Sequence, residues 1–146
     1  SHAWNFATKR VELAKDSTAP VVEYANQYTL PSDCLRVLKI HTGTTDSIKS
    51  TIDYVVEGRK IKTDEGTVFL VYIALITDPN EYDTYFNEAL SAALAADLAY
   101  AITNNATLSN NYQAIADERL REARFVDATE NSLGTVESNE FTDARL

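Results

Sequence analysis

The chain has 146 residues, of which 45% are hydrophobic and 24% are charged, and its formal net charge is −9. This size and composition fit one globular domain over residues 1–146, and they exclude an intrinsically disordered chain. The longest apolar run, residues 68–76, is too short to cross a bilayer, and a single cysteine excludes an internal disulfide. We therefore expect no membrane contact and a protein made in a reducing cytoplasm.

The charge is unevenly distributed along the chain. Residues 1–73 hold nine Lys or Arg and nine Asp or Glu, whereas residues 74–146 hold four Arg and thirteen acids. The whole excess of −9 therefore lies in the second half. Tight binding to nucleic acid needs clustered Lys and Arg, so this distribution argues against it. Solubility alone would also account for the acidic half.

Apolar residues alternate with polar ones in the first half, which is typical of half-buried strands. The pattern predicts strands over residues 10–14, 22–30, 35–40, 52–56, 60–63 and 67–76. Gly58 favours a tight hairpin between the fourth and fifth, because glycine adopts positive φ without steric cost. The last run is apolar on both faces, which predicts a central strand. Residues 8–76 should therefore form an antiparallel β-sandwich or small barrel of five or six strands.

After Pro79 the apolar period changes to that of a helix. A first helix is predicted over residues 85–103, with Asp83 or Thr84 as its cap, and seven of its residues are alanines that allow a neighbouring element to approach closely. A second helix is predicted over residues 110–129, where Asn110 and Gln113 resemble a capping box. The fold class is therefore α+β, with a two-helix hairpin over residues 83–130.

Periodicity is lost from Asn131 onward. Residues 131–146 are acidic but still contain the large apolar residues Leu133, Phe141 and Leu146. We expect an extended C-terminal arm that stays disordered until a partner binds it.

Residue types that carry catalysis are scarce in this chain. It has only two histidines, and its four glycines are isolated, so no glycine-rich loop can hold a phosphate. A nucleophilic site built from Cys34 and His41 stays open, although Cys34 also suits a small core position. Asp78 and Asn80 resemble the start of a calcium loop, but Ala89 stands where that loop needs a bidentate glutamate. We expect no enzyme, no metal and no cofactor.

Asp97 lies on the apolar side of the predicted alanine-rich helix. It is either partly exposed or bonded to nearby backbone, or it contacts a second subunit, because a buried carboxylate needs a partner. The eight tyrosines also favour subunit contacts weakly, since tyrosine suits wet interfaces.

Several short motifs occur in a recognisable order. They are Trp4-Asn5-Phe6-Ala7, Tyr28-Thr29-Leu30-Pro31 running into Asp33-Cys34-Leu35-Arg36-Val37, Val56-Glu57-Gly58-Arg59-Lys60-Ile61, Tyr72-Ile73, residues 82–96 and Arg119-Leu120-Arg121-Glu122-Ala123. In this order they resemble the tail tubular protein A family, the head-to-tail adaptors of short-tailed bacteriophages, over nearly the whole chain. The family has a helical segment before the tryptophan, so an N-terminal helical segment is expected to be missing here.

The resemblance implies a ring, typically a dodecamer in this family, at the head-to-tail junction of the virion. The helical part would contact the portal protein, the β part would receive the downstream tail (nozzle) protein, and DNA would pass through the channel without specific binding. Residues Phe125, Leu133, Phe141 and Leu146 are then candidate contacts with the portal or an adjacent subunit, and Asp97 is a candidate channel or interface acid. An acidic half facing the axis would repel DNA and let it slide.

Three other functions stay open at this point. The first is a neck or head-completion protein of a long-tailed phage. The second is a non-viral α+β binding module, and the third is an enzyme acting on small molecules.

Overall fold

The protein is described here by a computed structural model, which places the backbone of residues 2–43 and 52–143 and the side chains of residues 2–43 and 52–130. The chain divides into two compact units. The β unit comprises residues 7–77, where the sequence predicts residues 8–76, and the helical unit comprises residues 1–6 together with residues 78–146.

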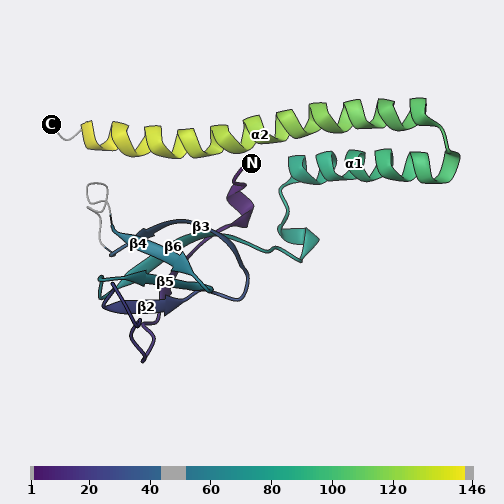
Figure 1. The fold of residues 1–146 in the computed structure, drawn as a ribbon. Coiled ribbons are helices and arrows are strands. Elements are labelled where there is room, and N and C mark those ends of the chain that lie inside the picture. The colour runs from purple at the N-terminus through teal and green to yellow at the C-terminus, as the bar shows by residue number, and fades with distance from the viewer. Residues whose placement is uncertain (1, 44–51, 144–146) are drawn as a thin grey trace. The chain divides into compact units, whose positions relative to one another are not determined.

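The β unit contains two three-stranded antiparallel sheets (Figure 1). The first sheet has the order β1 (Thr8–Leu13), β6 (Val68–Ala74) and β3 (Cys34–His41). The second has the order β2 (Asn26–Thr29), β5 (Lys60–Thr63) and β4 (Tyr54–Glu57). The α+β fold class and the six-strand architecture are thus confirmed.

Both sheets contribute to one core. Tyr28 and Ile61 come from the second sheet, and Val68, Leu70 and Tyr72 come from β6, which is buried on both faces as predicted. Burying each aliphatic side chain of this size contributes about 2 kcal/mol to stability. The buried hydroxyl of Tyr28 donates to the carbonyl oxygen of Glu65 at 2.7 Å, so this polar group has a partner inside the core.

The predicted strand over residues 22–30 is wrong in its first half. β2 begins at Asn26, and Glu23 has a φ of 74°, which is incompatible with a strand. Val21 and Val22 are exposed in the loop before it. In the described part of the chain no strand pairs with these residues. Their alternation of apolar and polar residues therefore does not lead to a strand.

The hairpin between β4 and β5 turns at Gly58, as predicted, with a φ of 56°. Arg59 also has a positive φ of 60°, so the turn has the two left-handed residues of a type I′ hairpin. The guanidinium of Arg59 donates to the carbonyl oxygens of Pro31 and Cys34 at 2.6 and 3.3 Å. These charge-assisted bonds offset the cost of placing a residue with a side chain in this conformation.

The hydroxyl of Tyr72 should make the stability of the β unit depend on pH in the alkaline range. Its hydroxyl donates to Oδ1 of Asp33 at 3.1 Å, and burial, followed by this bond to a carboxylate, raises its pKa to about 12. The neutral form therefore stabilises the fold fully below about pH 10, and this contribution, on the order of 3 kcal/mol, is lost as the pH rises through 12. A Tyr72→Phe variant should lose less stability between pH 10 and 12 in urea unfolding than the wild type. Equal losses in both proteins would contradict the assignment.

The helical unit is an antiparallel hairpin of α1 (Thr84–Thr103) and α2 (Ala106–Asp143), which lie side by side (Figure 1). Asp83 precedes α1, but its side chain makes no capping hydrogen bond. α1 ends at Asn104 in the left-handed conformation, with a φ of 52°. Asn105, not Asn110, caps α2, because its Oδ1 accepts from the backbone N–H of Leu108 at 3.1 Å.

The second helix runs further than predicted at both ends. It begins at Ala106, and Gln113 donates to Asp117 within the helix instead of completing a capping box at Asn110. The expected extended arm over residues 131–146 is corrected as well, since the backbone is helical as far as Asp143. This stretch has no proline, and its few apolar residues do not recur at helical spacing, so no apolar period indicated a helix.

Alanines line the contact between the two helices. Ala89 and Ala96 of α1 and Ala116 and Ala123 of α2 are all buried. Such small side chains let the two backbones approach closely, and the hydroxyl of Ser109 reaches the carbonyl oxygen of Ala96 at 3.0 Å. The close packing predicted from the alanine-rich sequence is therefore realised between α1 and α2. As a result, the leucines of α1 are available on its other face.

Candidate functional site

An exposed apolar stripe runs along α1. Leu90, Leu94 and Leu98 are spaced by four residues, so they lie on one face of the helix, and Ile102 follows at the same interval. Leu94, Leu98 and Ile102 are 53%, 56% and 78% exposed. We call Leu90, Leu94 and Leu98 the leucine stripe. Leu90, at 37%, is the least exposed of the three, and a row of exposed leucines on a helix is a candidate contact surface.

Asp97 lies beside the leucine stripe. It follows Leu94 by three residues, a spacing that places the two side chains next to each other on the helix surface, and it is exposed. Its exposure agrees with the first of the two interpretations, and the contact with a second subunit stays a prediction.

Phe125 of α2 is 72% exposed, more than Tyr112, the other aromatic residue of this helix whose side chain is described. It was predicted as a contact residue, and its exposure is compatible with that role. Leu133 and Phe141 fall within the helical backbone of α2, but their side chains lie outside the described residues, as does the whole of Leu146.

Two grooves flank the contact between the helices. The larger has a volume of about 420 Å³ and is crossed by the pair of Glu88 and Arg119, whose charged atoms are 3.6 Å apart. The smaller, about 180 Å³, is lined mainly by Phe86, Leu90, Ala93 and Leu120. The larger groove is lined mostly by polar and charged residues, whereas apolar residues predominate in the smaller one.

A buried carboxylate that the sequence did not reveal organises the helical unit. Asp127 of α2 is 4% exposed, and its Oδ2 accepts from Nε2 of His2 at 2.7 Å. Its Oδ1 accepts from the backbone N–H of Asn5 at 3.1 Å, and the side-chain amide of Asn5 donates to the carbonyl oxygen of Asp127 at 2.9 Å. Residues 2–6 are thereby held on α2.

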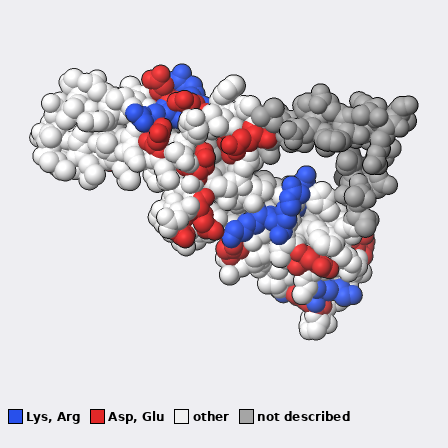
Figure 2. Space-filling view, turned by 180° about the vertical axis from the view of Figure 1, so that it is seen from behind, with Lys and Arg blue, Asp and Glu red and all other residues white. Residues whose placement is uncertain are grey.

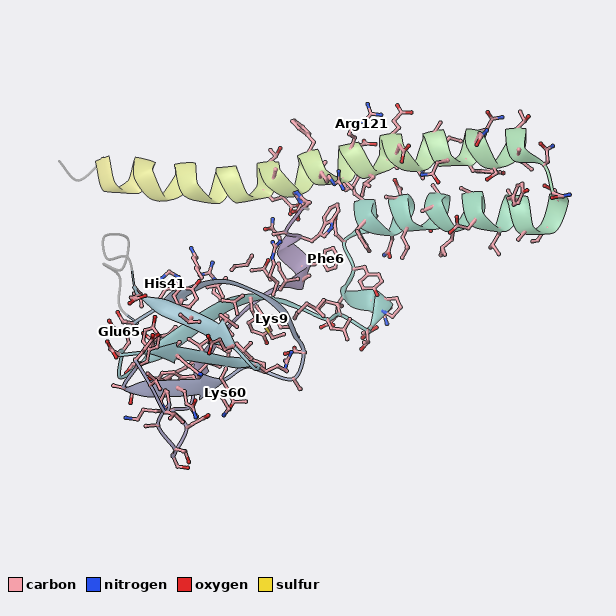
Figure 3. All side chains as sticks on the ribbon, viewed as in Figure 1. Phe6, Lys9, His41, Lys60, Glu65 and Arg121 are labelled. Atoms are coloured by element: carbon pink, nitrogen blue, oxygen red, sulfur yellow. The ribbon has the colours of Figure 1, made fainter. Side chains whose placement is uncertain are left out.

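Aromatic rings complete this attachment. Phe86 of α1 lies at the centre, with ring centroids 5.1 Å from Trp4, 5.0 Å from Phe6 and 5.4 Å from Tyr82. Phe6 is labelled in Figure 3 on the segment that leads into β1. Such edge and tilted ring pairs each add about 1 kcal/mol beyond their area burial. We call residues 2–6 the N-terminal strap.

One signal in the sequence could have found Asp127. Ala116, Leu120 and Ala123 recur at helical spacing along the seam with α1, and Asp127 continues that series by four residues. A carboxylate in line with an apolar stripe needs a partner if it is buried. That reasoning pointed to Asp97, but it holds for Asp127.

Neither of the two candidate chemical sites forms in the structure. Cys34 begins β3 and His41 ends it, so the two residues lie at opposite ends of the strand and do not form one site. Burial raises the pKa of the Cys34 thiol, which opposes nucleophilic reactivity. Asp78 caps a short 3-10 helix, η2 (Pro79–Glu81), by accepting from the backbone N–H of Asn80 at 3.0 Å. Within the described residues no group of three or more metal-binding side chains occurs.

Two comparisons with known proteins found no match, so the geometry of the site is the evidence for function. No protein-family model matches the chain, and no curated protein matches it either. In the described part of the chain, no helix has the length and apolar character needed to span a bilayer.

Proposed function

We propose that this chain is a head-to-tail adaptor of a bacteriophage, a structural protein that forms a ring between the portal and the tail. The observation that carries the proposal is the leucine stripe, an exposed apolar surface on a helix whose opposite face is already packed against α2. A subunit of a ring needs such a surface for its neighbour or for the portal.

The fold supports this proposal through its agreement with what the resemblance implies. A six-strand β unit is followed by a two-helix hairpin, and Phe86 and Trp4 lie in the motifs on which the resemblance depends. In the proposed arrangement the helical unit contacts the portal protein, and the β unit receives the downstream tail protein. The acidic helical half would repel DNA from the channel wall, so DNA would pass without specific binding.

Electron microscopy of tail-less, DNA-filled capsids of the phage that encodes this chain tests the proposal. Capsids incubated with the full chain should gain a ring with an axial channel at the portal vertex. Capsids without a portal serve as the control, and they should gain no density.

Three outcomes would contradict the adaptor. A ring that joins a contractile or long tail tube would identify a neck protein instead. A monomer that binds neither capsid would favour a cellular binding module, and turnover of a small molecule would favour an enzyme.

A further inference from the structure

One face of the first sheet points away from the core and combines apolar and basic residues. In β6, Phe69, Val71 and Ile73 alternate with the core residues Leu70 and Tyr72, so they form a row on the outer face. We call Phe69, Val71 and Ile73 the β6 row. On this outer face Val71 is 3% exposed and lies buried between Phe69 and Ile73, which are half-buried, so Phe69 and Ile73 are the members of the row that a partner can reach.

Basic side chains flank the β6 row on both neighbouring strands. Arg10 of β1 and Lys39 of β3 lie opposite Val71, and Arg36 of β3 lies opposite Ile73. Residues directly opposite each other in adjacent strands share a face, so these three exposed cations border the row. Figure 2 shows a stripe of Lys and Arg atoms on the β unit. Glu12 is the acid on this face and lies opposite Phe69.

Arg10 and Lys39 differ in their ion pairing from three lysines elsewhere in the β unit. Lys9, Lys60 and Lys62 are each paired with a carboxylate, of Asp33, Asp16 and Glu57 respectively. Within the described residues Arg10 and Lys39 make no ion pair. A partner that offers a carboxylate would therefore find two cations whose charge is not yet matched.

The face is hollowed at the Phe69 end. A groove of about 400 Å³ is lined by residues of β1, β3 and β6 that include Arg10, Glu12, His41 and Phe69. His41 is labelled at the end of β3 in Figure 3. Gly43 lies against the ring of Phe69, where a Cβ would come within 1.9 Å of it. The groove thus has an apolar floor and a charged rim.

We propose that this face of the first sheet receives helix α1 of a second copy of the chain, with its leucine stripe over the β6 row and its Asp97 beside Lys39 and Arg10. The inference rests on the proposed function, because it names the contact between neighbours in the ring. Two different surfaces meet in this contact, and such a heterologous contact closes into a ring when its rotation allows.

The spacing of the two rows is compatible. Residues four apart on a helix rise by about 6 Å, so the leucine stripe spans about 12 Å. Alternate residues of a strand are separated by about 6.7 Å, so the β6 row spans about 13 Å. Phe69 and Ile73, at the two ends of the row, can therefore meet Leu90 and Leu98 at the two ends of the stripe, with Leu94 over the buried Val71. Asp97, three residues after Leu94 and beside it on the helix surface, then supplies a negative charge for Lys39 and Arg10.

Charge alone would also suit a nucleic acid, but the face argues against that occupant. Phosphate binding uses clustered cations and gains nothing from Phe69 and Ile73 at the centre of the patch, and Glu12 would repel it. The β6 row with its bordering cations instead complements the leucine stripe of α1 with the neighbouring Asp97.

Cross-linking with mixed isotopes tests the contact directly. Equal amounts of ¹⁴N- and ¹⁵N-labelled full chain are treated with a carbodiimide, which joins an amine to a touching carboxylate without a spacer. We expect Lys39–Asp97 links between labelled and unlabelled peptides. The pairs Lys9–Asp33 and Lys62–Glu57 provide controls, because they should link within one isotope only. Lys39 links confined to one isotope, or absent at the highest soluble concentration, overturn the proposal.

Charge exchange tests the geometry of the contact. Lys39→Asp and Asp97→Lys each place like charges opposite each other, so each variant alone should self-associate at least tenfold more weakly in sedimentation velocity. Their mixture should recover association, because every contact between unlike copies is again one Lys against one Asp. Lys15→Asp and Asp117→Lys are exposed controls with the same charge changes, and they should behave as the wild type. Unaffected single variants, or a mixture that fails to recover, contradict the inference.

The inference and the proposed function can fail separately. Rings on portal-bearing capsids without a Lys39–Asp97 link retain the adaptor and reject this contact. The link and the charge-exchange recovery without any ring on capsids retain the contact and reject the adaptor.

Discussion

Replacing Asp127 by alanine is expected to destabilise the helical unit by about 3 kcal/mol. The substitution removes the acceptor of His2 Nε2 and of the Asn5 backbone N–H, both of them half-buried donors, and each donor that loses its partner costs about 1–3 kcal/mol. The loss is limited by release of the N-terminal strap, which would return these donors to water but would also expose Trp4 and Phe6. The urea midpoint should therefore fall.

The fluorescence of Trp4 measures this change directly, because Trp4 is the single tryptophan of the chain and lies in the strap. Its emission should shift to the red in Asp127→Ala even before unfolding. Asp127→Asn, which keeps the shape and one acceptor, should lose less than alanine does. Asp117→Ala removes an exposed carboxylate of the same helix and should change stability by less than about 0.5 kcal/mol. Unchanged Trp4 emission and midpoint in Asp127→Ala would refute this account.

Replacing Ala123 by leucine should destabilise the helical hairpin by about 2–3 kcal/mol. Ala123 is 0% exposed, and the seam between α1 and α2 is lined by alanines, so three added carbon atoms have no space unless the helices separate. For a unit of this size the midpoint of thermal unfolding, followed by circular dichroism at 222 nm, should fall by roughly 10–20 °C.

Ala114→Leu is the matched control, because Ala114 lies exposed on the same helix and leucine has nearly the same helix propensity as alanine. Its melting midpoint should stay close to that of the wild type. If the two variants melted together, close packing along the seam would not be what stabilises the hairpin. A lowered midpoint confined to Ala123→Leu supports the interpretation that small residues on one face of α1 leave its leucines for a partner.

Local patterns were sufficient for much of the fold. The hairpin at Gly58, the doubly buried strand β6 and the alanine-rich helix α1 were each predicted from neighbouring residues, because their signals are local: a positive φ, an apolar run and a helical period. The prediction failed for residues 22–25 and beyond residue 130. In the first case an apolar alternation found no partner strand, and in the second a polar helix showed no period.

For the candidate site, the sequence suggested Asp97 and Phe125 as contact residues, a prediction that stays open, and it missed the arrangement around them. Phe125 stood out as a large apolar residue, and its exposure could not be known before α2 was packed on α1. Residues 1–73 have a net charge of zero, so no excess of positive charge pointed to the basic face of the first sheet. The register of the strands decides which cations share that face.

The sequence by itself determined the elements of this protein: six strands, a hairpin of two helices, an acidic second half and a lack of clustered catalytic residues. The tertiary structure alone decided that Asp127 is the buried acid and Asp97 the exposed one, although both follow apolar stripes. The physical reason is that burial depends on what packs over a residue. The strap that covers Asp127 comes from residues more than a hundred positions away, and no local pattern records that contact.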